Sequence, residues 1–132
     1  AVIYYEDHEG QGDAAGLAGG DVDAPAMWLF STALECPDPV CLALIIYHEA
    51  MHLQVDLDNL PVPAGAKDPG HVVVYSAQVD LARRIAPEAV ARLERRVECS
   101  RTGRSEPGRV CYLYLPLSDY WERYLMRDVV QR

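Results

Sequence analysis

Residues 39–60 read PVCLALIIYHEAMHLQVDLDNL, and this segment decides the fold that the sequence predicts. Pro39 suits the first position of a helix, where its missing N–H does no harm, and no further proline or glycine occurs before Pro61. The apolar run at residues 40–47 fits a helix buried in a core and is too short to span a membrane. We therefore predict a long central helix from Pro39 to about Leu60.

Shorter elements are expected on both sides of this helix. Apolar runs bounded by turn residues predict strands over residues 2–5, 26–30 and 110–115. Helical patterns predict further helices over residues 72–86, 88–97 and 119–130, although residues 72–74 could instead open as a strand. The glycine-rich stretch 10–20 is expected to be a loop. We predict an α+β fold in a single domain spanning residues 1–132, with a small mixed sheet packed on the central helix and the other helices around it.

The chain is acidic, with 20 Asp and Glu against 12 Lys and Arg and a net charge of −8. Proteins that bind nucleic acid normally present a basic surface. The arginine-rich stretch between residues 83 and 109 is diluted by glutamates, which is typical of a solvated helix face. We therefore expect no nucleic-acid partner, and we expect no membrane span because no apolar run approaches about 18 residues.

The four cysteines form two pairs that are close in sequence, Cys36 with Cys41 and Cys99 with Cys111. Each pair brackets a segment rich in turn residues, and no Cys-x-x-Cys spacing typical of a zinc site occurs. We predict two local disulfides, hence an oxidising compartment and a secreted protein, with buried free thiols as the alternative. Residues 1–12 lack the basic region and apolar core of a signal peptide, so we expect none in that stretch.

The central segment also contains His48-Glu49-Ala50-Met51-His52, the pattern HExxH. Side chains four residues apart share a helix face, with Cβ atoms about 5–6 Å apart, so both imidazoles can reach one Zn²⁺ at about 2.0–2.1 Å. Glu49 is about 100° further round the helix and points beside the metal. A hydrogen-bonded core cluster is the alternative, but each buried polar group would then need its own partner. The pattern therefore predicts zinc ligands at His48 and His52 and a general base at Glu49.

The HExxH segment resembles the active-site helix of the zincin metallopeptidases. The apolar strand expected at residues 26–30 is also similar to the sheet edge along which zincins bind peptides. The resemblance implies a zincin-like fold and a zinc-dependent endopeptidase that cleaves an extended protein or peptide, with Glu49 acting as base and then as acid. Two other functions stay open: an effector or toxin module that cuts one specific protein, and a non-catalytic binding module stabilised by zinc.

The third zinc ligand decides the zincin subfamily, and His71 is the preferred candidate. The segment from His71 to Tyr75 has a His-x-x-x-aromatic pattern that resembles the third-ligand segment of SprT-like zinc proteases. Asp68, upstream of Tyr75, resembles the aspartate ligand of the aspzincins, which are deuterolysin-like proteases. Asp58 has the metzincin spacing, and Glu88 is a candidate of the gluzincin type. The sequence leaves Asp68, Asp58 and Glu88 as alternatives to His71.

Tyrosines offer a further catalytic group, because zincins often stabilise the developing oxyanion with a Tyr or His side chain. Most tyrosines in a domain of this size pack in the core with a hydrated hydroxyl group. The candidates are Tyr75, Tyr112, Tyr114, Tyr120 and Tyr124. The sequence does not single out one of them.

Overall fold

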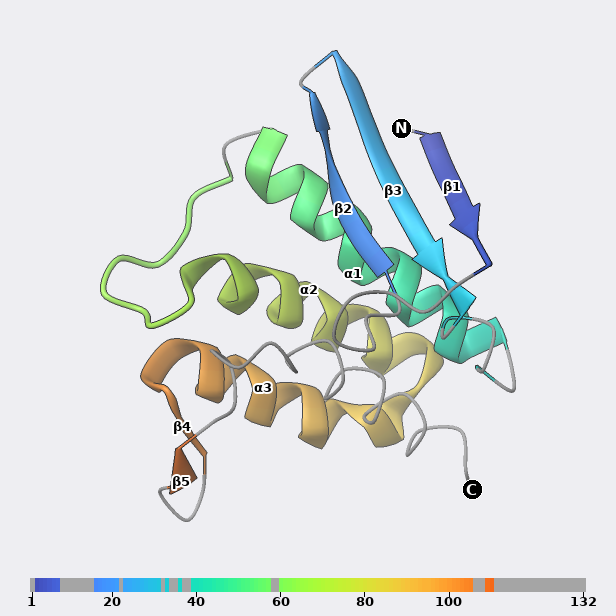
Figure 1. Cartoon of the computed structure of the whole chain (residues 1–132). Coiled ribbons are helices and arrows are strands. Elements are labelled where there is room, and N and C mark those ends of the chain that lie inside the picture. The colour runs from blue at the N-terminus through green and yellow to red at the C-terminus, as the bar shows by residue number, and fades with distance from the viewer. Residues whose placement is uncertain are drawn as a thin grey trace.

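A three-stranded sheet lies along one helix, and two more helices follow on the other side of that helix (Figure 1). The computed structural model describes residues 2–7, 16–21, 23–31, 33, 36, 39–57, 60–105 and 109–110. Within these residues the chain has the predicted α+β class, with a small mixed sheet packed on a long helix.

The sheet has the strand order β1-β3-β2 and consists of β1 (Val2–Glu6), β2 (Gly16–Asp21) and β3 (Ala24–Phe30). β1 runs parallel to β3, and β2 runs antiparallel to it. The strands predicted at residues 2–5 and 26–30 are confirmed. The loop predicted through residues 10–20 is wrong for residues 16–20, because the backbone of β2 pairs with β3 despite three glycines that weaken its side-chain signal.

The predicted central helix is α1 (Pro39–Leu57), which contacts both β2 and α2. Leu44 and Ile45 of α1 are buried in the core. Val79 and Ala82 of α2 and Leu93 of α3 pack in the same cluster. α1 therefore carries side chains that face the sheet and side chains that face the helical core. None of the helices in the described part of the chain is long and apolar enough to cross a membrane.

α2 (Pro69–Ile85) begins before the predicted start at residue 72, so the strand alternative for residues 72–74 is wrong. Asp68 is the N-cap residue and Pro69 takes the first position, a combination that starts a helix. η3 (Pro87–Ala89) and α3 (Val90–Thr102) follow, and α3 continues past the predicted end at residue 97. α3 ends at Gly103, whose φ of 75° favours glycine.

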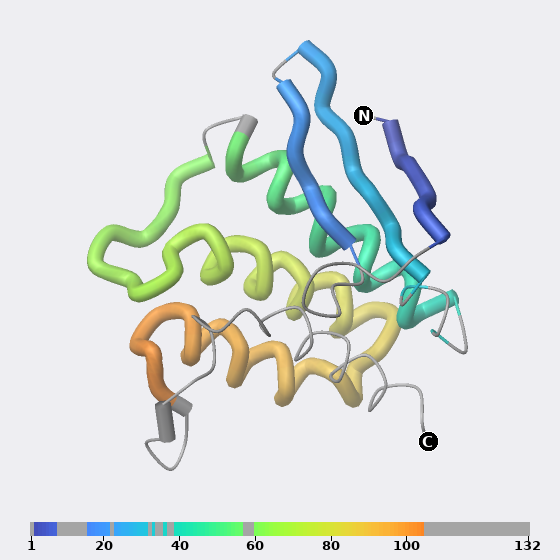
Figure 2. Tube along the Cα trace, in the orientation of Figure 1, coloured from blue at the N-terminus to red at the C-terminus, as the bar shows by residue number. Residues whose placement is uncertain are grey.

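The chain reverses direction between α1 and α2 and again between α2 and α3 (Figure 2). The start of α2 therefore lies beside the end of α3, where backbone N–H groups of Lys67 and Asp68 donate to the carbonyls of Arg101 and Ser100. β4 (Arg104–Ser105) and β5 (Arg109–Val110) form a short antiparallel pair after α3. The remainder of the strand predicted at 110–115 and the helix predicted at 119–130 lie outside the described residues.

The predicted disulfide between Cys36 and Cys41 is confirmed, and it joins the residues just before α1 to the first turn of that helix. Cys99, in the last turns of α3, is also disulfide-bonded. Its predicted partner, Cys111, lies outside the described residues. Disulfides form and persist in oxidising compartments and are rare in the reducing cytosol.

Candidate metal centre

His48 and His52 lie one turn apart on α1, and their ring nitrogens approach each other. The two Nε2 atoms are 3.0 Å apart. His48 is buried, with 1% of its surface exposed, and His52 is half-buried. Two ring nitrogens this close need a proton or a cation between them, since two lone pairs repel. Nitrogen ligands on one tetrahedral zinc lie about 3.3 Å apart, so the spacing suits two ligands of one ion.

His71 reaches the same point from the first turn of α2. Its ring centroid is 4.6 Å from that of His52 and 5.5 Å from that of His48. One ring nitrogen from each histidine lies within 4.8 Å of the others, so the three lie close enough to bind a metal ion. Among the residues that the structure describes, no other histidine, cysteine or carboxylate joins this cluster. Three imidazole nitrogens form a donor set that suits zinc and related transition metals.

Asp68, one alternative for the third ligand, contacts His71 instead of joining the cluster. Its Oδ2 lies 2.8 Å from Nδ1 of His71, and its Oδ1 accepts a 3.4 Å hydrogen bond from the His71 backbone N–H. The hydrogen bond from His71 lowers the pKa of the Asp68 carboxyl below its ordinary value, and partial burial opposes this effect. Because Nδ1 of His71 faces Asp68, its other ring nitrogen, Nε2, is the one available to a metal. A carboxylate in this position orients a ligand histidine.

The structure does not support Glu88 or Asp58, the other two candidates for the third metal ligand. Glu88 is exposed in η3, beyond the C-terminal end of α2, whereas His71 is in the first turn of that helix. The intervening helix is about 20 Å long, so Glu88 is too far away to be a ligand. Asp58 lies outside the described residues. The metzincin pattern needs the chain to turn back at Val55, but α1 continues through Val55 to Leu57.

Gln78 is a site residue that the sequence analysis missed. It is fully buried on α2, and its Oε1 lies 3.0 Å from Nδ1 of His48. Its Nε2 donates to the backbone carbonyl of Leu44 over 2.9 Å. A signal was present in the sequence, because Gln78 follows His71 by two helical turns and so shares its face of α2. A glutamine on an apolar helix face needs hydrogen-bond partners, and here α1 provides them.

Tyr75 packs behind the histidines. Its side chain is 2% exposed, and its ring centroid lies 5.2 Å from that of His48 and 5.3 Å from that of His71. The guanidinium carbon of Arg96, a residue of α3, lies 5.8 Å from the Tyr75 ring centroid. Tyr75 therefore supports the position of both imidazoles. The other tyrosine candidates, Tyr112, Tyr114, Tyr120 and Tyr124, lie outside the described residues.

Glu49 follows His48 on α1 but faces the sheet. Its side chain is buried, with 6% of the residue exposed. A Cβ atom built on Gly16, the first residue of β2, would lie 2.9 Å from Cγ and 3.2 Å from Oε1 of Glu49. The carboxylate is therefore next to β2, while His48 faces Gln78 on α2. Glu49 lies on the sheet side of the candidate metal centre.

The strand expected to bind peptides, residues 26–30, cannot offer a free edge. β3 is the central strand, and it pairs with β1 on one side and with β2 on the other. This expectation is therefore wrong, because the sequence did not reveal β2. The edge strand next to α1 and Glu49 is β2, which pairs with β3 alone among the described strands.

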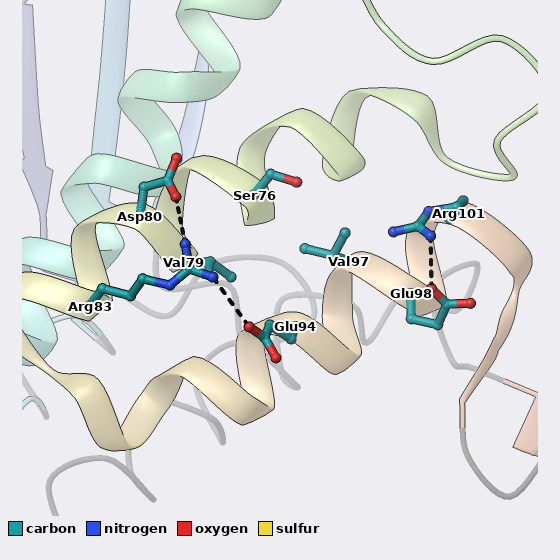
Figure 3. Close-up of a pocket in the computed structure, with 8 residues that line it drawn as sticks. All are labelled: Ser76, Val79, Asp80, Arg83, Glu94, Val97, Glu98 and Arg101. Atoms are coloured by element: carbon teal, nitrogen blue, oxygen red, sulfur yellow. Dashed lines mark hydrogen bonds and ion pairs between the residues drawn. The ribbon is translucent and has the colours of Figure 1, made fainter.

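A hollow of about 400 Å³ lies between α2 and α3 (Figure 3). No histidine of the cluster lines it. Arg83 pairs with Asp80 at 3.2 Å and with Glu94 at 3.5 Å, and Arg101 pairs with Glu98 at 3.2 Å. Both arginines that line the hollow are thus already paired with carboxylates, and we assign no chemistry to this hollow.

No protein-family model matches this chain, and neither a curated protein nor a solved structure matches it. Three clustered histidines occur in more than one class of metalloprotein, so the cluster alone does not define a zincin.

Proposed function

We propose that this protein is a zinc-dependent endopeptidase in which His48, His52 and His71 hold the metal and Glu49 transfers the proton. The observation that carries the proposal is the convergence of three ring nitrogens within 4.8 Å, with a buried carboxylate one residue along the helix. This is the arrangement that the HExxH pattern is expected to produce.

The number of protein ligands supports a catalytic site. Structural zinc sites normally use four protein ligands, whereas catalytic sites use three and keep a position for water or substrate. The cluster consists of three histidines within the described residues. This favours an enzyme over a binding module stabilised by zinc. Zinc would supply a Lewis acid and would lower the pKa of bound water to about 7.

Glu49 is the group of this chain that would move the proton. Its carboxylate follows His48 directly and lies on the sheet side of the three histidines. From there it would accept a proton from the attacking water and later donate it to the leaving amine. Its burial supports this role, because a low-dielectric site strengthens its interaction with developing charge.

An extended peptide is the substrate that fits the sheet next to Glu49. Among the described strands β2 pairs with β3 alone, so the backbone N–H and C=O groups on its other side could pair with a peptide. A peptide that adds to this edge would gain main-chain hydrogen bonds and run past Glu49 at Gly16. We therefore move the expected substrate contact from residues 26–30 to β2. Cleavage of many members of a peptide library would indicate a broad endopeptidase, and cleavage of one protein alone would indicate an effector module.

A secreted location agrees with this function. The Cys36–Cys41 disulfide and the disulfide at Cys99 are expected to persist outside the reducing cytosol. We propose that the enzyme acts in an extracellular or otherwise oxidising compartment. Comparison of the intact mass under reducing and non-reducing conditions, after thiol alkylation, checks the oxidation state of the native protein.

Glu49→Gln tests the catalytic proposal directly. The variant keeps the size of the side chain but cannot act as a base, so we expect cleavage of unfolded protein or a peptide library to fall at least 100-fold. Zinc content, measured by mass spectrometry, should stay equal to that of the wild type. Glu88→Gln makes the same chemical change at an exposed site outside the cluster and should keep full activity. Zinc-dependent cleavage that survives Glu49→Gln would contradict the assigned role.

A further inference from the structure

We propose that Gln78 fixes the tautomer of His48, so that Nε2 of this histidine is ready to bind a metal before any metal arrives. Gln78 is then a positioning residue on α2 that acts on a ligand of α1. This inference rests on the three-histidine site and does not depend on peptide hydrolysis.

The orientation of the Gln78 amide follows from the carbonyl of Leu44. A backbone carbonyl can only accept a hydrogen bond, and Gln78 approaches it with Nε2 at 2.9 Å. The reversed amide would place two acceptor oxygens against each other. The carbonyl of Leu44 therefore requires the amide nitrogen on its side, which leaves Oε1 of Gln78 facing His48.

The tautomer of His48 follows from the orientation of that amide. Oε1 of Gln78 lies 3.0 Å from Nδ1 of His48. An amide oxygen can only accept, so Nδ1 must carry the proton. A neutral imidazole has one N–H, and Nε2 of His48 therefore keeps the lone pair that a metal needs.

Burial protects the hydrogen bonds that join Gln78 to His48 and to Leu44. Gln78 and Leu44 are fully buried, and His48 is 1% exposed, so water does not compete for these hydrogen bonds. Leaving a buried polar group without its partner costs about 1–3 kcal/mol. His71 is set in a similar way, because its Nδ1 lies 2.8 Å from Oδ2 of Asp68, and an ionised carboxylate can only accept. Two of the three candidate ligands are thus oriented by neighbouring side chains before metal binding.

Nitrogen-15 NMR of the metal-free protein at pH 8 tests the proposal, because ring nitrogen shifts and long-range couplings report which nitrogen carries the proton. We expect wild-type His48 to be the Nδ1–H tautomer. A spectrum that assigns the proton to Nε2 of His48 would overturn the proposal by itself, without any variant.

Two substitutions at Gln78 separate its acceptor oxygen from its bulk. Gln78→Met keeps the length of the side chain and removes the acceptor, so we expect His48 to lose its Nδ1–H preference and zinc affinity to fall about 10–100-fold. Gln78→Glu keeps an oxygen acceptor toward His48 but loses the hydrogen bond to the Leu44 carbonyl, so it should keep the Nδ1–H tautomer in a less stable protein. Gln54→Met makes the same chemical change as Gln78→Met on an exposed face of α1 and should alter neither the tautomer nor the zinc affinity.

Competition with a chelating dye measures these affinities independently of catalysis. If Gln78→Met binds zinc as tightly as Gln54→Met, or keeps His48 in the Nδ1–H form, Gln78 does not set the tautomer. If Gln78→Met does not fold, the wild-type spectrum still decides, since an Nε2–H tautomer of His48 there would overturn the proposal.

Discussion

The position of Glu49 depends on the absence of a side chain at Gly16. Gly16 is buried at the start of β2, and a Cβ atom there would come within 2.9 Å of Cγ of Glu49 and 3.2 Å of the Trp28 carbonyl oxygen. Real Cβ atoms do not tolerate the shorter of these distances, so either Glu49 or the strand would have to move. The glycine therefore lets the sheet and the carboxylate approach each other closely.

Gly16→Ala should displace Glu49 while leaving the histidines in place. We expect kcat for peptide cleavage to fall about 10–100-fold, since a misplacement of about 1 Å has effects of this size. Zinc affinity should change less than threefold, because no ligand is touched. Gly19→Ala is the matched control in the same strand, since its Cβ would meet the Trp28 ring at an ordinary 3.6 Å. Equal activity of the two variants would mean that Gly16 does not position Glu49.

The start of α2 is the element that places His71. Asp68 caps this helix, and its own backbone N–H donates to the Ser100 carbonyl at the end of α3 over 2.8 Å. The neighbouring Lys67 N–H donates to the Arg101 carbonyl over 3.1 Å. The end of α3 thus contacts the start of α2, and the capping residue Asp68 also contacts the His71 imidazole at 2.8 Å. Cys99, in the same last turns of α3, is disulfide-bonded.

Asp68→Asn should remove a pH-dependent part of the stability at this helix start. Because the pKa of the Asp68 carboxyl is lowered in the folded protein, its stabilising contribution is present above its unfolded pKa of about 3.9 and is lost as the pH falls through the lower folded pKa. Asparagine caps a helix about as well, so the charge is the main change. Urea unfolding of metal-free protein should show the wild type more stable at pH 6, with a difference that shrinks below about pH 4.

Asp80→Asn is the control for this pH series. It makes the same change on the same helix, at an exposed pair with Arg83 that is worth little. The stability of this variant should stay close to that of the wild type at every pH. A gap between wild type and Asp68→Asn that stays constant down to pH 3 would show that the carboxylate contributes no charge-dependent stability.

In the molecule as a whole, the three-histidine cluster and the helical core share the same helices but use different faces. Leu44, Ile45, Val79 and Leu93 form a buried cluster that needs no metal. The histidines lie beside this core and are already oriented by Asp68 and Gln78. We therefore expect the fold to survive without metal, and we expect metal binding to add stability to a chain that is already folded.

Zinc removal should lower the thermal stability and leave the helices in place. Circular dichroism at 20 °C should be unchanged after dialysis against a chelator. Zinc at 100 times its Kd should restore about 2.7 kcal/mol of unfolding free energy by mass action, seen as a higher Tm. His71→Ala should show a much smaller gain. A wild-type Tm that does not respond to zinc would contradict binding to the native state, and loss of the helical signal on chelation would contradict a preformed fold.

Much of the helical part of the fold could be predicted because its signals are local. The apolar run after Pro39 predicts α1, and HExxH on a helix places His48, His52 and Glu49 without tertiary information. β2 could not be predicted in this way, since its three glycines carry no side-chain pattern and its pairing with β3 uses backbone groups alone. That omission also led to the wrong choice of β3 as a free edge.

The rest of the site depends on contacts between elements that are distant in sequence. The position of His71 depends on hydrogen bonds between the backbone just before α2 and the last turn of α3. No spacing in the sequence reveals these contacts. The pair Asp68-Pro69 is a local signal for a helix start that the sequence analysis missed, because it placed the start of this helix at residue 72. From the sequence, Gln78 could be recognised only as an amide on the same helix face as His71. Its partners could not be predicted, because Leu44 and His48 belong to another helix.

An anomalous difference map from a crystal of the zinc-loaded protein, measured on both sides of the zinc absorption edge, tests the central claim most directly. The account predicts one strong peak that marks a zinc ion about 2.0–2.1 Å from one ring nitrogen each of His48, His52 and His71. A solvent oxygen beside Glu49 should occupy the fourth coordination position. A peak at any other place, or a fourth protein side chain in that position, would contradict it.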